Sequence, residues 1–150
     1  EFEVNLVTST NIFDSRNSNS NNFNRSLKAP SSNAESSWTQ FMKDFAVWHT
    51  PGNTAVTGQT YSTTYTINIT VAGDYILEYS ADNLGNITFD GSNVASNFGD
   101  FDLAPGSITL SNLSVGTHTL VASIINSVDA NADWDSNPAG IAWRLQPSGT

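Results

Sequence analysis

Cysteine is absent from the 150-residue chain, which excludes disulfide bonds and thiolate metal sites. Basic residues are scarce: five Lys and Arg stand against 14 Asp and Glu, so the formal net charge is −9. Such a chain is repelled by a phosphate backbone and by an anionic lipid surface, which argues against nucleic acid and membrane partners. The longest apolar runs span only a few residues, so we expect no membrane insertion.

Charged residues make up only 13% of the chain, and neutral polar residues take their place. Asn, Ser and Thr together supply 54 of the 150 residues. A surface covered by hydroxyl and amide groups is typical of extracellular and virion β-proteins, so we expect an extracellular or virion location. Hydrophobic residues amount to 38% of the chain, which suffices for one packed core.

Alternating polarity predicts the fold class. In Y-S-T-T-Y-T-I-N-I-T-V at 61–71, aromatic and branched residues mostly take the odd positions, and Ser, Thr and Asn take the even ones. Asp90-Gly91 is a hairpin signal. Further short strands are expected within 3–13 and over 73–81, 86–91, 92–95, 107–111, 117–127 and 140–146. Together they predict an all-β chain that forms an antiparallel, jelly-roll-like β-sandwich.

The organisation along the chain is one domain with two appended segments. Residues 1–37 are expected to form an N-terminal strand plus an Asn/Ser-rich arm or loop, residues 38–146 the sandwich core, and residues 147–150 a C-terminal tail. Trp38, Phe41 and Phe45 follow helical spacing. This spacing predicts one short helix near 38–44, with Ser36 or Ser37 as its N-cap.

An oxygen-rich segment at 129–137 is the most prominent candidate site. Its oxygen side chains stand at alternate positions and can converge on one calcium ion when the chain curls. These metal candidates are Asp129, Asn131, Asp133 and Asp135. The same residues also suit a solvated acidic loop, and the sequence leaves both interpretations open. Trp134 is either an exposed platform for a sugar ring or a lid folded back over the core.

Five segments carry a family resemblance. They are W-T-Q-F-M-K-D-F-A-V-W at 38–48, A-G-D-Y-I-L-E-Y-S-A-D-N at 72–83, I-T-F-D-G at 87–91, V-G-T-H-T-L at 115–120 and W-D-S-N-P-A-G-I-A-W at 134–143. The series resembles a β-sandwich module of phage tail fibres and other virion proteins, and its centre looks like the protective-antigen lectin domain. Calcium-dependent members of that lectin family carry a paired Asp-Asp where this chain has Asp82-Asn83.

The resemblance implies that the loop at 82–86 lies beside the loop at 129–137 and that the two form one rim. Asp82 and Asn83 suit a turn equally well, so that alternative stays open. The ligand-binding residues expected on this rim are Asp82, Asn83, Asp133, Trp134 and Asn137.

We expect no enzyme activity. The chain has no nucleophile elbow, phosphate loop or H-E-x-x-H sequence. No acidic residue stands at a suggestive spacing from His49 or His118, so both are expected to be structural.

The leading hypothesis is a virion-associated or extracellular adhesion domain that binds a host-surface glycan, with calcium as a candidate cofactor. The alternative is a structural subunit of a fibre, filament or capsid decoration. In that case residues 1–37 exchange a strand with neighbouring virion or fibre subunits, which gives a homo-oligomer. A glycan hydrolase is the third and weakest hypothesis.

Overall fold

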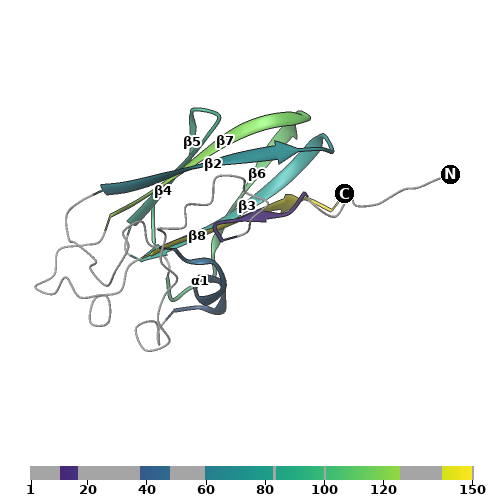
Figure 1. The fold of residues 1–150 in the computed structure, drawn as a ribbon. Helices are drawn as coiled ribbons and strands as arrows, with labels where there is room; N and C mark the ends of the chain where they lie inside the picture. Colours follow the sequence, from purple (N-terminus) through teal and green to yellow (C-terminus); the bar gives the residue numbers. More distant parts are fainter. Residues whose placement is uncertain are drawn as a thin grey trace, which may run out of the picture.

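A computed structural model describes residues 11–16, 38–47, 60–82, 84–99, 101–125 and 140–149. These residues form one short helix and eight strands (Figure 1). The elements are β1 (Phe13–Asp14), α1 (Gln40–Phe45), β2 (Thr60–Ile69), β3 (Gly73–Asp82), β4 (Leu84–Phe89), β5 (Ser92–Phe98), β6 (Gly106–Leu113), β7 (Gly116–Ile125) and β8 (Gly140–Pro147). No helix that the structure describes is long and apolar enough to span a bilayer.

The strands form two four-stranded antiparallel sheets. One sheet has the order β1-β8-β3-β6 and the other the order β2-β7-β4-β5. The chain passes to the opposite sheet at every connection between described strands except the β4–β5 hairpin. This is the strand arrangement of a jelly roll. The predicted fold class, including the short helix, is therefore confirmed.

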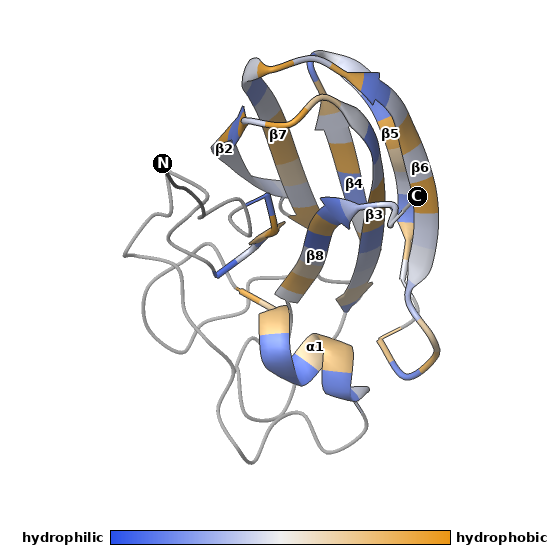
Figure 2. Ribbon diagram, turned by 90° about the vertical axis from the view of Figure 1, so that its right-hand side faces the viewer, coloured by the Kyte–Doolittle hydropathy of each residue, from blue (hydrophilic) through white to orange (hydrophobic). Residues whose placement is uncertain are grey.

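The core lies between the two sheets, where alternate residues of each strand face inward. Figure 2 shows the resulting alternation of hydrophobic and hydrophilic residues along the strands. Tyr65 of β2 and Trp143 of β8 meet across the interior, with ring centroids 4.9 Å apart and ring planes at 81°. Both side chains are fully buried. Edge-to-face contact of two large aromatic rings thus joins the sheets at their centre.

The helix α1 packs on the outer side of the β1-β8-β3-β6 sheet. Its Met42 is buried together with Trp38, Ala46 and Ala142 of β8 in a second, smaller hydrophobic cluster. The hydroxyl group of Thr39 accepts a hydrogen bond from the Met42 amide at 3.3 Å and caps the helix. The expected cap at Ser36 or Ser37 is therefore wrong, because the chain turns into the helix two to three residues later.

The residues around β1 fasten the C-terminal end of this helix to the sandwich. The guanidinium group of Arg16 donates hydrogen bonds to the carbonyl oxygen of Ala46 at 2.8 and 3.0 Å and to that of Lys43 at 3.0 Å. A cation at the end of a helix stabilises the carbonyl groups that lack partners inside the helix. The hydroxyl group of Ser15 donates to the Phe45 carbonyl oxygen. Residues 13–16 are thus part of the folded core.

The turn between β4 and β5 follows its sequence signal. Asp90 has φ +50° and Gly91 has φ +83°, the left-handed conformations that a tight hairpin turn requires. Only glycine adopts such a φ without steric cost, and Asp is among the residues that tolerate it best. The hairpin predicted from Asp90-Gly91 is confirmed.

Candidate functional site

Asp82 is the last residue of β3, and its side chain contacts that of Trp38. Its carboxylate oxygen Oδ2 accepts a hydrogen bond from the Trp38 indole nitrogen at 2.9 Å. Only 6% of Asp82 is exposed. Burial raises the pKa of Asp82 to about 6; the hydrogen bond from Trp38 lowers it, and the negative charge of Asp102 raises it. Asp82 therefore anchors the segment that leads into α1, and its contact with a ligand stays a prediction.

The other expected rim residues lie outside the described part of the chain. They are Asn83, Asp129, Asn131, Asp133, Trp134, Asp135 and Asn137. The expected loop at 82–86 is wrong, because Asp82 ends β3 and residues 84–86 already belong to β4. The contact of a rim with a ligand or a calcium ion stays a prediction. Among the residues that the structure does describe, no group of three or more acidic or histidine side chains could hold a metal ion.

The outer face of the β2-β7-β4-β5 sheet carries side chains in register across three strands. One row consists of Ser62, Ser123 and Asn86, and the next of Thr64, Val121 and Thr88. The thirteen outward residues of the three strands define what we call the hydroxyl face. They are Thr60, Ser62, Thr64, Thr66, Asn68, Leu84, Asn86, Thr88, Thr117, Thr119, Val121, Ser123 and Ile125. None of these residues is charged or aromatic, and ten of them carry a hydroxyl or amide group.

Hydrogen bonds between neighbouring strands hold parts of the hydroxyl face in place. The hydroxyl oxygens of Ser62 and Ser123 lie 2.7 Å apart, and Thr117 donates to the amide oxygen of Asn68 at 2.9 Å. The outer face of the other sheet differs, because α1 packs on it and an ion pair between Arg144 and Glu78 crosses it at 2.7 Å. Figure 1 shows no described element on the outer side of the hydroxyl face.

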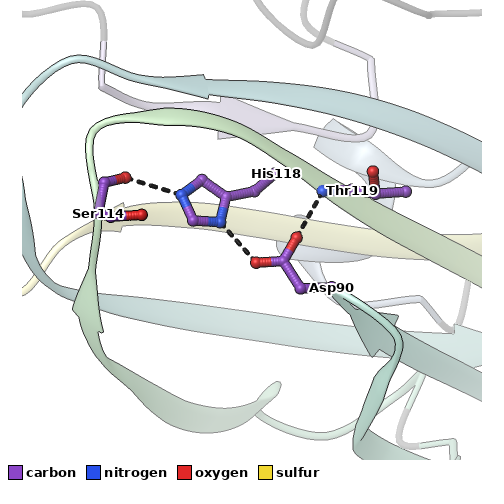
Figure 3. A network of polar contacts seen from close by, with 4 residues as sticks. All are labelled: Asp90, Ser114, His118 and Thr119. Carbon is purple, nitrogen blue, oxygen red and sulfur yellow. Dashed lines mark hydrogen bonds and ion pairs between the residues drawn. The ribbon is translucent and has the colours of Figure 1, made fainter.

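The end of β4 and the start of β7 lie at the opposite end of the sandwich from α1 (Figure 1), and there His118 forms a polar network with Asp90 (Figure 3). Its Nδ1 lies 2.6 Å from Oδ2 of Asp90, and its Nε2 lies 2.7 Å from the Ser114 carbonyl oxygen. The other carboxylate oxygen of Asp90 accepts a hydrogen bond from the Thr119 amide at 2.9 Å. The sequence does not predict this pair, because the two residues are 28 positions apart and meet only through the pairing of β4 with β7.

With Asp90 ionised, the geometry of this network favours a doubly protonated imidazole ring. A carboxylate and a carbonyl oxygen can only accept hydrogen bonds, so both ring nitrogens must donate. Burial lowers the pKa of His118, but the hydrogen bonds to Asp90 and Ser114 and the charge of Asp90 outweigh it, so the pKa lies above its ordinary value. Both nitrogens are engaged, so the ring is not available as a general base. The expected structural role fits this arrangement.

Comparisons with known proteins leave the family open. No protein-family model matches the sequence, and no curated protein matches it. A family 35 carbohydrate-binding module from Clostridium thermocellum aligns with 93% of this chain and 95% of its own, at 15% identity and a TM-score of 0.44. A β-glucosidase from Kluyveromyces marxianus aligns with 59% of this chain at 12% identity and a TM-score of 0.46. A GH2 β-galacturonidase from Eisenbergiella tayi aligns with 70% at 18% identity and a TM-score of 0.46.

The chain spans only 12% of the length of that glucosidase and 21% of that of the galacturonidase. At these TM-scores and identities, the similarities carry no conclusion about function.

Proposed function

We propose that this chain is a non-catalytic carbohydrate-binding domain that acts on the cell exterior or on a virion, as an adhesion or receptor-binding module. The observation that carries the proposal is the hydroxyl face, where ten neutral polar side chains stand in register on a sheet surface that no described element covers. The acidic residues that give the chain its charge of −9 are absent from this face.

The chemistry of the hydroxyl face matches that of a neutral glycan. Each Ser or Thr hydroxyl donates one hydrogen bond and accepts others, and each Asn amide also does both. Sugar hydroxyl groups have the same dual character, so they can replace the water molecules that hydrate such a face. The face has no aromatic ring on which a sugar could stack. We therefore expect weak binding per contact and stronger binding when several copies are displayed together.

The expected rim, beyond the end of β3, would add further contacts with the glycan. In this proposal the rim would follow the buried Asp82, and the oxygen-rich segment at 129–137 would supply the calcium ligands. In this proposal calcium orders the rim, and the hydroxyl face binds with or without it.

A glycan array and affinity electrophoresis with neutral polysaccharides test the proposal, both with and without a chelator. Thr64→Glu places a charge in the middle of the hydroxyl face, and we expect it to abolish binding. Thr109→Glu is the matched control, because Thr109 is equally an exposed strand residue but lies on β6 of the other sheet. The proposal fails if the parent protein binds no neutral glycan, or if Thr64→Glu binds as well as the Thr109→Glu control.

A structural subunit is the second candidate function, and the edge strands favour it. β2 has ten residues and pairs with β7 on one side, while its other side pairs with no described strand. An open edge of this length can receive a strand from a neighbouring subunit. Sedimentation velocity of the full chain and of a chain without residues 1–10 separates the two candidates. A structural subunit forms oligomers that the deletion removes, whereas an adhesion domain binds glycan in both forms.

A further inference from the structure

A cavity of about 410 Å³ opens at the end of the sandwich away from α1. It lies where the β2–β3 turn, the end of β6 and the end of β8 meet, and its walls include Val71, Asp74, Asn112 and Pro147. Its volume lies within the ~300–1,000 Å³ range of small-molecule sites. The cavity is separate from the hydroxyl face, because Asp74, Asn112 and Pro147 all belong to the other sheet.

Hydrogen bonds fix each of the three segments that form this cavity. The carboxylate oxygen Oδ1 of Asp74 accepts from the Asn112 amide at 2.8 Å, and the Asp74 carbonyl oxygen accepts from the Ser148 amide at 3.0 Å. The phenol group of Tyr75 donates to the Val71 carbonyl oxygen at 2.7 Å and so holds the β2–β3 turn. The shape of the cavity is therefore set before any ligand arrives.

A β-bulge directs Asn112 into this arrangement. The pairing of β3 with β6 shifts by one residue between Gly73 and Tyr75, and Asn112 adopts φ +57° there. Bulges of this kind change the direction of a side chain at a sheet edge. The bond from the Asn112 backbone amide to Asp74 stabilises the bulge, so the positions of Asn112 and Asp74 in the cavity wall depend on each other.

The walls of the cavity have both apolar and polar parts. Val71 is 52% exposed, and Pro147 is also exposed, so together they offer an apolar surface. Asp74 is the only charged residue among those that line the cavity. In the described part of the chain, its second oxygen Oδ2 accepts no hydrogen bond. A carboxylate oxygen of this kind is a strong acceptor for hydroxyl groups.

We propose that this cavity is a second ligand site, which takes a single uncharged sugar ring. Such a ring has an apolar face of C–H groups, which would lie against Val71 and Pro147. Its hydroxyl groups would donate to Asp74 and exchange hydrogen bonds with the side-chain amide of Asn112. Acidic sugars are excluded, because their carboxylate would meet that of Asp74 in a protein of net charge −9. The site goes beyond the proposed function, since it does not require the hydroxyl face to bind.

Titration of the ¹⁵N-labelled full chain with methyl glycosides tests this site residue by residue. The probes are methyl glucoside, methyl galactoside, methyl mannoside and, as the charged comparison, methyl glucuronide. We expect at least one neutral glycoside to shift the amide signals of Asp74, Asn112 and Ser148, while methyl glucuronide shifts none of them. Thr64 and Ser123 report on the hydroxyl face in the same spectra, so the two sites are read separately.

Asp74→Asn keeps an oxygen that can accept from the Asn112 amide but removes the charge. We expect it to weaken binding of the neutral glycoside roughly ten-fold, since hydrogen bonds to a charged acceptor are about twice as strong. Asp44→Asn is the control, because it makes the same chemical change at an exposed position on α1. Val71→Ser tests the apolar wall, and Val115→Ser is its control in a neighbouring turn that does not line the cavity.

The outcomes separate this site from the proposed function. The site is supported if Asp74→Asn and Val71→Ser reduce the signal shifts at the cavity while the controls Asp44→Asn and Val115→Ser leave them intact. This holds even if no polysaccharide binds the hydroxyl face. The site is refuted if no neutral glycoside shifts these signals at millimolar concentrations, where a ligand with a Kd of about 1 mM would bind. It is equally refuted if Asp74→Asn and Asp44→Asn bind alike, or if methyl glucuronide binds as well as the neutral probes.

Discussion

The protonated His118 makes the stability of the protein depend on pH in a defined direction. The perturbation is His118→Asn, combined with a change of pH from 6 to 9. Because the folded-state pKa of His118 is raised, its contribution is fully present below the unfolded value of about 6.5 and is lost as the pH rises through the folded value. We expect the free energy of unfolding of the parent protein to decrease over this range. In His118→Asn, the part of this decrease that comes from the His118 side chain should be missing.

The magnitude follows from the two hydrogen bonds of the ring. The Nδ1 contact to Asp90 and the Nε2 contact to Ser114 are both short, at 2.6 and 2.7 Å. A hydrogen bond to a charged group contributes about 1.5–3 kcal/mol. Asp90 is 46% exposed, so solvent screening reduces its share, and we expect about 1–2 kcal/mol in total. This corresponds to roughly 2–8 °C in Tm for a domain of this size.

Urea unfolding between pH 6 and 9 measures this effect, and nitrogen NMR of the imidazole ring reports its protonation directly. His49→Asn is the matched control, because His49 is the only other histidine of the chain. We expect His49→Asn to keep the pH dependence of the parent protein. A ring that carries a single proton at pH 6, or equal pH dependence in His118→Asn and the parent protein, would refute the reasoning.

Three further predictions concern other parts of the fold. The buried carboxyl of Asp82 has its pKa raised to about 6, so the folded protein binds more protons than the unfolded chain between pH 4 and 6, and stability falls as the pH rises through this range. Asp82→Asn should flatten this fall, which amounts to roughly 1–3 kcal/mol in urea unfolding. Gly106→Ala should destabilise by about 1–3 kcal/mol, because the new Cβ atom would lie 2.4 Å from the Tyr79 ring. Asp133→Ala and Asp135→Ala should each remove any increase in Tm that calcium gives, while the far-UV spectrum stays unchanged.

Each of these three predictions has an outcome that contradicts it. If Asp82→Asn and the parent protein lose stability equally between pH 4 and 6, the carboxyl of Asp82 titrates at its ordinary pKa. If Gly106→Ala unfolds at the same urea concentration as the parent, the Tyr79 ring can move aside without cost. An identical calcium response in the parent protein and in both loop variants removes the metal proposal. Asp44→Asn serves as a control for the charge change of Asp82→Asn, since Asp44 is exposed on α1.

The sequence predicts the strands well because burial repeats at every second residue. Tyr65, Ile67 and Ile69 are buried as their odd positions predict, while Thr64 and Asn68 are exposed. A turn signal such as Asp90-Gly91 is equally local, since it depends on the conformational preference of two residues. Features of this kind need no knowledge of which strands are neighbours.

Features that depend on the pairing of distant strands could not be predicted. The contact of Trp38 with Asp82 joins residues 44 positions apart, and that of Asp90 with His118 joins residues 28 apart. The hydroxyl face has the same origin: the sequence predicts a polar side of the strand at 61–71, but only the strand order places β7 and β4 beside it. The helix cap at Thr39 instead of Ser36 or Ser37 shows the usual uncertainty of two or three residues at a helix end.

The position of β8 has a consequence for how the protein is made and how it can be damaged. β8 lies between β1 and β3, and its residues Gly140–Trp143 are all buried. During synthesis β8 leaves the ribosome after every other described strand. The strands β1 and β3 therefore cannot form their hydrogen bonds with β8 until it has been synthesised. A premature stop anywhere between β7 and β8 would therefore remove a strand from the middle of a sheet and not from its edge.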